Sequence, residues 1–119
     1  MSGVVLALVT LAAAAGHVDS GARGVATIGP TCPVERPGDP SCRDKPYRAG
    51  LKVVRARDRS LVKRFTPHAD GSFVVHLVSG RYLIEKTGSA RLPSLSPVAV
   101  AVRSHRFARV AVRLDSGIR

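Results

Sequence analysis

The stretch that decides the fold, residues 66–85, reads TPHADGSFVVHLVSGRYLIE. Within it, large apolar side chains recur at every second position, a pattern typical of strands that bury one face. The side chains expected in the core are Phe73, Val75, Leu77, Tyr82 and Ile84. Asp-Gly at 70–71 and Ser-Gly at 79–80 favour turns, because glycine accepts positive φ and aspartate bonds to its own following backbone. We therefore expect hairpins at both dipeptides, joining consecutive strands into a meander.

Further short strands are expected on both sides of this stretch. The expected strands cover residues 24–28, 49–57, 60–66, 73–78, 81–85, 98–102 and 107–114. Over residues 60–66 the phase stays open, because Leu61 and Phe65 alternate with Val62 and Arg64. This spacing predicts an all-β fold, a seven-stranded antiparallel β-sandwich of Greek-key, Ig-like or prealbumin-like type.

The strand motifs carry a family resemblance. The signature consists of Asp70, Gly71, Phe73, Gly80 and Tyr82. It resembles the motif of carboxypeptidase regulatory-like domains, which are transthyretin-like (prealbumin-type) β-sandwiches, and Ala49-x-Leu51-x-Val53 is similar to an earlier strand of that family. The resemblance covers residues 24–114, with Ser79 where the family usually has proline. It implies a secreted bacterial accessory module without catalytic activity or a cofactor.

The first part of the chain predicts export. Residues 4–15 form an uncharged apolar run ending in small residues, as in the core of a signal peptide, although no Lys or Arg precedes it. Such a run is shorter than the roughly 20 residues that span a bilayer, so a retained anchor is the weaker alternative, as is a buried helix. Cleavage is expected near Ala15 or Ala22, which divides the chain into a signal peptide (1–22) and a sandwich domain (23–119) located in the cell envelope or outside the cell.

The two cysteines are expected to form a disulfide. Cys32 and Cys42 bracket a proline-rich loop, and an even, closely spaced pair in an exported chain is typical of a structural bridge. Closing a loop of this size removes about 2.8 kcal/mol of unfolded-state entropy. No histidine or second cysteine pair lies between them, so no metal site is predicted.

The charge pattern permits two interpretations. The formal net charge is +11, carried mainly by arginine, which either reflects a GC-rich coding sequence or serves anion binding, since guanidinium pairs well with phosphate and carboxylate. The candidate anion-binding stripe consists of Arg103, Arg106, Arg109 and Arg113. Arg55, Arg57 and Arg64 would extend it if the fold brought them near.

The partners compatible with this stripe are an anionic cell-wall polymer, lipid head groups at a membrane surface, or an acidic protein. Specific nucleic-acid binding is not expected, because the chain has only three Phe and two Tyr with which to stack bases. A monomer is expected.

No catalytic residue is predicted. The four histidines, His17, His68, His76 and His105, lie in separate segments, and Ser116 has no nucleophile-elbow context. The chain ends Asp-Ser-Gly-Ile-Arg, whereas hydroxyisourate hydrolase, a catalytic relative on a similar fold, ends in Tyr-Arg-Gly-Ser. The sequence thus favours a non-catalytic binding or structural module, with a protein-interaction accessory domain and a hydrolase on a transthyretin-like fold as the alternatives.

Overall fold

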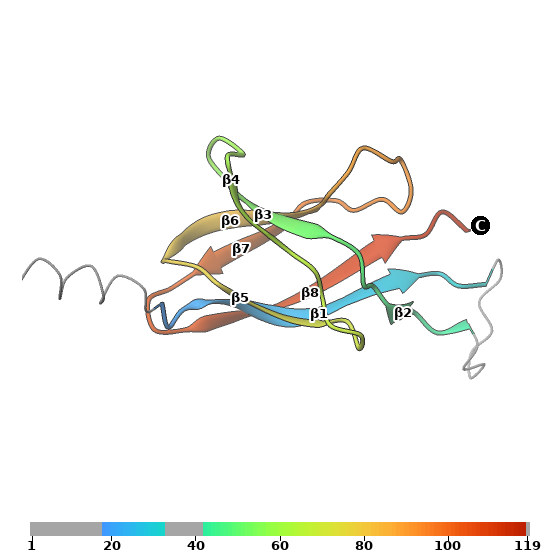
Figure 1. Cartoon of the computed structure of the whole chain (residues 1–119), viewed down its shortest axis with the longest axis horizontal. Helices are drawn as coiled ribbons and strands as arrows, with labels where there is room; N and C mark the ends of the chain where they lie inside the picture. The colour runs from blue at the N-terminus through green and yellow to red at the C-terminus, as the bar shows by residue number, and fades with distance from the viewer. Residues whose placement is uncertain (1–17, 33–41, 119) are drawn as a thin grey trace, which may run out of the picture.

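The structure, a computed structural model, is a sandwich of two β-sheets (Figure 1). It describes residues 18–32 and 42–118. The predicted signal-peptide residues up to 17, most of the proline-rich loop (33–41) and Arg119 lie outside the described residues. Within the described ranges the elements are all β, which confirms the predicted all-β sandwich. The described residues form eight strands where seven were expected, and one pair, β1 (Gly21–Gly29) with β8 (Phe107–Asp115), is parallel. None of the described segments is a helix long and apolar enough to cross a membrane.

The first sheet is built around the N-terminal strand. Its members are β1 (Gly21–Gly29), β2 (Lys45–Pro46), β5 (Ser72–His76) and β8 (Phe107–Asp115). One edge of β1 pairs along its whole length with β8 in a parallel ladder. The other edge pairs in antiparallel fashion with β5 and then with the short β2. The first and last strands of the sandwich are therefore neighbours.

The second sheet is antiparallel throughout, in the order β4-β3-β6-β7. Its members are β3 (Leu51–Arg55), β4 (Leu61–Phe65), β6 (Gly80–Lys86) and β7 (Val98–Val102). A register shift in the ladder between β3 and β4 leaves Val62 as an extra residue. Because of this bulge, Val62 and Phe65 both pack against the core. Simple alternation therefore left the phase of this strand open.

The predicted meander is wrong. β5 pairs with β1 in the first sheet, whereas β4 and β6, its neighbours in sequence, belong to the second. The Asp-Gly and Ser-Gly dipeptides therefore lie on connections that cross between the sheets, and neither closes a hairpin. The alternation in β5 shows only that one face of the strand is buried. A strand in a hairpin has one buried face, and so does a strand that lies across a core about 10 Å thick from the strands before and after it in sequence.

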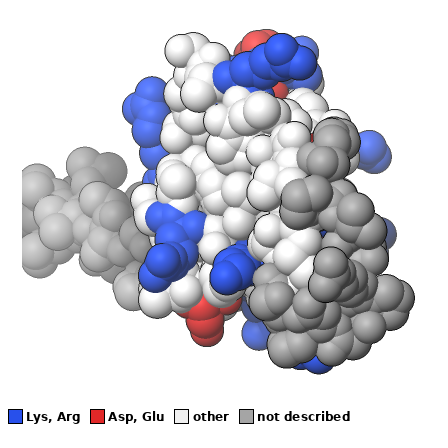
Figure 2. Space-filling model, turned by 90° about the vertical axis from the view of Figure 1, so that its right-hand side faces the viewer, with Lys and Arg blue, Asp and Glu red and all other residues white. Residues whose placement is uncertain are grey.

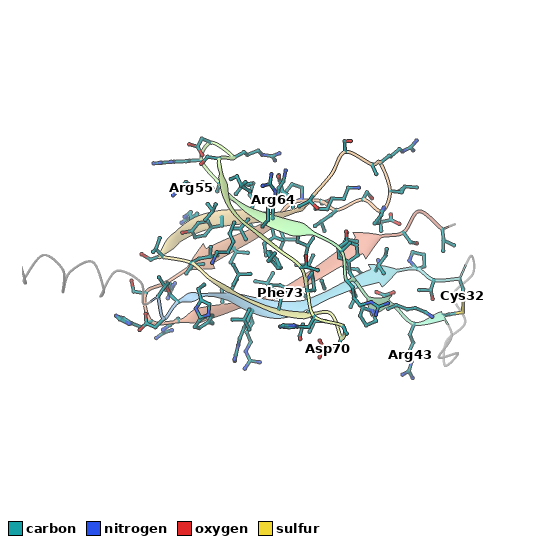
Figure 3. All side chains as sticks on the ribbon, viewed as in Figure 1. Cys32, Arg43, Arg55, Arg64, Asp70 and Phe73 are labelled. Atoms are coloured by element: carbon teal, nitrogen blue, oxygen red, sulfur yellow. A yellow bond between two sulfur atoms is a disulfide. The ribbon has the colours of Figure 1, made fainter. Side chains whose placement is uncertain are left out.

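The core lies between the sheets and contains the predicted side chains. Phe73, Val75 and Leu77 from the stretch that includes β5 are buried, as are Tyr82 and Ile84 from β6. Figure 3 shows Phe73 between the two sheets, with its ring centroid 5.1 Å from that of Phe65. The predicted core faces are confirmed.

The signature residues shape the connections on either side of β5. Asp70 Oδ1 accepts hydrogen bonds from the backbone N–H (2.9 Å) and the hydroxyl (2.6 Å) of Ser72, and these bonds hold the pKa of Asp70 below its usual value. Gly71 has φ +85° and comes so close to Ala26 O that a Cβ would lie 2.4 Å from it. At the second crossing, the Tyr82 hydroxyl donates to Val78 O at 2.6 Å.

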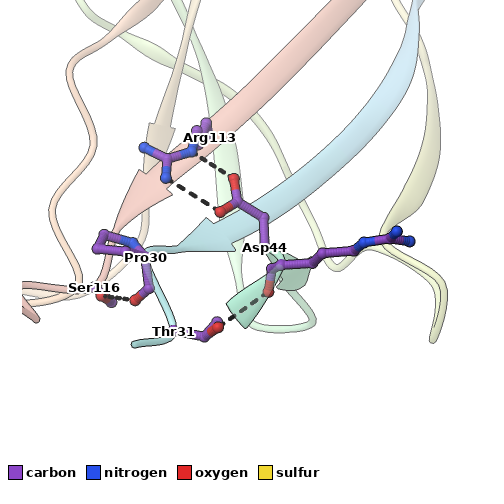
Figure 4. Close-up of polar contacts among 6 residues, drawn as sticks. Pro30, Thr31, Asp44, Arg113 and Ser116 are labelled. Carbon is purple, nitrogen blue, oxygen red and sulfur yellow. Dashed lines mark hydrogen bonds and ion pairs between the residues drawn. The ribbon is translucent and has the colours of Figure 1, made fainter. Parts of the chain in front are cut away.

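The end of the sandwich at which β1 and β8 finish is tied together by covalent and polar contacts. The predicted disulfide between Cys32 and Cys42 is present, with a Cα–Cα distance of 5.2 Å. Polar contacts shown in Figure 4 join Asp44 to Arg113, Thr31 to Arg43 and Ser116 to Pro30. They connect the segment around β2 with the ends of β1 and β8.

The start of β1 is an integral part of the sandwich. Ser20 is buried, and its hydroxyl donates to Leu77 O at 2.6 Å. Gly21 and Ala22 pair with both β5 and β8. Removal of the residues up to Ala15 leaves these contacts intact, whereas a cut after Ala22 removes the first two residues of β1.

Candidate functional site

The structure distributes the predicted stripe over three places. Arg109 lies mid-strand on β8, and Arg113 follows four residues later, about 13 Å along the strand. Arg113 is engaged by Asp44, with Nη2 3.1 Å from Oδ1, and this ion pair holds the pKa of Asp44 below its usual value. Arg103 and Arg106 flank the turn between β7 and β8, at the end of the sandwich away from Asp44. Of the four, Arg109 alone lines one of the two cavities described below.

A second arginine stands beside Arg109 on the outer face of the first sheet. Arg23 in β1 is the register partner of Arg109 in β8 and of Val74 in β5. Both arginines are exposed, and neither forms an ion pair with an acidic residue of the described ranges. The juxtaposition of two like charges without compensation is unfavourable for the free protein. It creates a local positive potential on this face.

The surface beside the two arginines is apolar. Two residues further along the same outer face, Val25 in β1 is the register partner of Ala111 in β8. Val25 and Val74 are 47% and 55% exposed. A shallow groove of about 590 Å³ runs across the three strands, lined by these apolar residues and by Arg23 and Arg109. We call this surface the sheet groove. Its apolar floor and cationic side suit a ligand that carries both apolar groups and carboxylates or phosphates.

One aromatic contact continues the apolar surface toward the start of β1. His76 and Phe107 are both register partners of Gly21. Because Gly21 has no side chain, the two rings meet across it, edge to face, with centroids 5.4 Å apart. Phe107 is therefore partly covered by His76.

A second pocket lies at the crossing between β5 and β6. It has a volume of about 470 Å³ and is lined by Arg55, Arg57 and Arg81 together with Val78 and Tyr82. Figure 3 shows Arg55 toward the end of the molecule opposite Cys32. The compensation of these charges is weak: Arg57 Nε lies 3.8 Å from Asp58, with the Arg57 side chain 82% exposed. Arg64, by contrast, is opposite Lys52 on the second sheet and lines neither cavity.

Arg23 and Arg81 were not predicted as site residues. Arg23 lies near the predicted cleavage site and is brought to Arg109 by the parallel pairing of β1 with β8, which no local pattern reveals. The alternation of Arg23, Val25 and Thr27 along β1 is the signal that would have placed Arg23 on an outward face. Arg81 is exposed in β6, and the fold places it beside the end of β3.

The described residues offer little for catalysis or metal binding. They contain no group of three His, Cys, Asp or Glu residues placed to bind a metal, and no such residue lines either cavity. The fold does bring His105 to Asp19, with Nδ1 2.5 Å from Oδ2, and this bond holds the pKa of Asp19 below its usual value. Both side chains are largely exposed. The Ser116 hydroxyl donates to Pro30 O at 2.6 Å.

Comparisons with known proteins identify a fold relative and no family. No protein-family model matches this chain, and no curated protein matches it. A solved structure of GBS52, the minor pilin of the Gram-positive pathogen Streptococcus agalactiae, is similar with a TM-score of 0.54 and 12% sequence identity. The match covers 82% of this chain and 44% of the pilin chain, so this chain spans less than half of that structure. The two share a β-sandwich fold.

Proposed function

We propose that the protein is an exported, non-catalytic interaction module of the carboxypeptidase regulatory-like type, and that it docks an acidic partner protein in the sheet groove. The observation that carries this proposal is the pair Arg23 and Arg109, adjacent in the β1–β8 ladder and without an acidic partner among the described residues. An approaching carboxylate relieves their mutual repulsion and forms charge-assisted hydrogen bonds.

The apolar floor favours a protein over a linear polyanion. Val25, Val74 and Ala111 present exposed hydrocarbon next to the arginines, and burying it is favourable only against another apolar surface. Protein interfaces combine such a patch with arginine, a residue enriched among their strongest contacts. A wall polymer of sugars and phosphates would use the charges and leave the valines exposed.

Export and the lack of catalysis are supported by several features. The Cys32–Cys42 disulfide fits an oxidising compartment. Of the two expected cleavage positions, Ala15 leaves β1 whole, and we propose it as the processing site. The signature residues Asp70, Gly71 and Tyr82 occupy structural positions at the crossings around β5, in accord with a non-catalytic role for this motif.

The proposal is tested with synthetic peptides of defined chemistry. An eight-residue peptide alternating Asp and Val, one alternating Asp and Ser, and inorganic polyphosphate are titrated into isotope-labelled protein, and backbone amide shifts are followed by NMR. The Asp-Val peptide is expected to bind at least tenfold more tightly than the Asp-Ser peptide, an increment typical of one buried apolar group. The shifts should centre on Arg23, Val25, Val74, Arg109 and Ala111.

Charge reversal at Arg23 and Arg109 should abolish this binding. The matched control reverses Arg43 and Arg91, which are exposed and outside the groove, and should retain it. Equal affinity for the two peptides, shifts centred elsewhere, or equal loss in both double variants would each contradict docking in the sheet groove.

A further inference from the structure

A second concentration of positive charge lies at the end of the sandwich where the described chain begins. Five exposed arginines gather there: Arg55, Arg57, Arg81, Arg103 and Arg106. We call this surface the arginine end. Gly80 is the register partner of Val102, which brings the start of β6 beside the end of β7 and so beside Arg103. The backbone oxygen of Arg106 accepts a hydrogen bond from the N–H of Gly21 at 3.1 Å. This bond holds the β7–β8 turn next to the first residue of β1.

Acidic residues at the arginine end are few and already engaged. Asp58 accepts hydrogen bonds from the N–H and hydroxyl of Ser60 at 3.0 and 2.7 Å, and Asp19 is bonded to His105. Figure 2 shows the opposite end, where Lys and Arg side chains lie on uncharged surface together with Asp and Glu side chains. The arginine end is thus a positively charged surface at one pole of the sandwich.

An exposed apolar side chain stands among these charges. Val78 is 60% exposed at the crossing between β5 and β6 and lines the same pocket as Arg55, Arg57 and Arg81. The backbone of Val78 is held in place, because its carbonyl oxygen accepts a hydrogen bond from the Tyr82 hydroxyl. Guanidinium groups around a projecting hydrocarbon side chain match the interface of a bilayer, where phosphates lie just above the acyl region.

The apolar N-terminal run brings a membrane to this same end. The described chain begins at Val18, whose carbonyl oxygen lies 3.0 Å from His76 Nδ1. The run ends at Ala15, and three residues span at most about 10 Å. Before cleavage at Ala15, while the run occupies a bilayer, Val18 therefore lies within about one Debye length of the head groups at 0.1 M salt. The arginine end is at the same end of the sandwich as Val18.

From these observations we infer that the arginine end is a membrane-facing surface that binds the head groups of anionic phospholipids, with Val78 at the centre of the contact. This inference rests on the proposed export and is independent of docking in the sheet groove. The contact orients the sandwich with its strands pointing away from the bilayer. The outer face of the first sheet then stands at the side of the module, accessible to a partner.

The inference is tested by co-sedimentation of the full chain with vesicles. The partition coefficient is measured on phosphatidylcholine vesicles and on vesicles that also contain phosphatidylglycerol. The ratio of the second coefficient to the first isolates the effect of lipid charge from insertion of the apolar run. The test variant replaces Arg55, Arg81 and Arg103 with Gln. Each arginine near an anionic bilayer contributes about fivefold to partition, so the ratio is expected to fall about a hundredfold.

The matched control replaces Arg43, Arg48 and Arg91, which are exposed and lie outside the arginine end, with Gln and keeps the same net charge. The ratio for this control should stay close to that of the unchanged protein. An equal fall of the ratio in both triple variants would overturn the inference. Displacement by soluble glycerol phosphate at constant ionic strength would also overturn it, because the pocket would then bind a free phosphate group. Failure of the apolar run to partition into phosphatidylcholine would instead count against export, since that measurement does not depend on the arginines.

Discussion

Replacement of Gly24 with alanine tests the parallel pairing that joins the first and last strands. Gly24 is the register partner of Val110 in β8, and a Cβ at Gly24 would lie 1.6 Å from the backbone oxygen of Val110. A carbonyl oxygen in a ladder cannot rotate away as a side chain can. The added methyl group must therefore separate β1 from β8 locally.

The expected cost follows from this overlap. Overpacking costs about 1–3 kcal/mol when neighbours can shift, and more when they cannot, so we expect Gly24→Ala to lower the free energy of unfolding by about 3 kcal/mol or more. For a domain of this size, each kcal/mol corresponds to about 4–8 °C in Tm, which predicts a fall of at least about 12 °C. That loss is a large fraction of the roughly 5–15 kcal/mol that holds a domain folded.

Gly88→Ala is the matched control, because it adds the same methyl group where nothing lies within 4 Å. Gly88 has φ +85°, so alanine there has the conformational cost of the left-handed region, about 1–2 kcal/mol, partly offset by the lower entropy of the unfolded chain. Both variants are measured by urea titration and thermal melting, followed by far-UV circular dichroism. A Gly24→Ala variant as stable as the Gly88→Ala variant would refute the parallel ladder.

Two further changes test local contacts. Tyr82→Phe removes the hydrogen bond from the Tyr82 hydroxyl to Val78 O and should lower the free energy of unfolding by about 1 kcal/mol in urea titration. Tyr47→Phe is the control and should leave the free energy of unfolding nearly unchanged, because the Tyr47 hydroxyl forms no hydrogen bond with another described residue. Asp44 has a pKa lowered by its bond to Arg113, so its contribution to stability is present above its ordinary pKa of 3.8 and is lost as the pH falls through the lower folded-state value. Asp44→Asn should therefore lower Tm near neutral pH and leave it unchanged in strong acid, and a pH-independent difference would contradict this.

The sequence specified the core well because burial in a sandwich is a local property of each strand. Phe73 and Val75 point inward whichever strand lies beside β5, so alternation identifies them without knowledge of the pairing. The same independence explains why the meander was wrong. Which strand pairs with which depends on contacts between residues far apart in the chain, such as Gly21 with Phe107, and alternation carries no information about them.

The candidate site depended on that missing information. Arg109 was predicted as a member of the arginine stripe, but its neighbour Arg23 comes from the other end of the chain and meets it only through the β1–β8 ladder. In the same way, Arg103 was grouped with Arg113 because both belong to one segment of sequence, whereas the fold places Arg103 near Gly80 and Arg113 next to Asp44. A charge pattern along one strand therefore predicts which side chains are exposed, while the sheet topology determines which charges act together.

Positive charge on the folded molecule is concentrated in two places, and each proposal rests on one of them. Repulsion among the arginines of the arginine end and between Arg23 and Arg109 lowers the stability of the free protein, and the described acidic residues do not compensate it where it is greatest. Val78 lines the pocket of one group, and Val25 and Val74 line the groove of the other. Each group combines positive charge with exposed hydrocarbon, and the two lie in different places: one is at the pole that we propose faces a bilayer, and the other is on the side face where we propose that a protein docks.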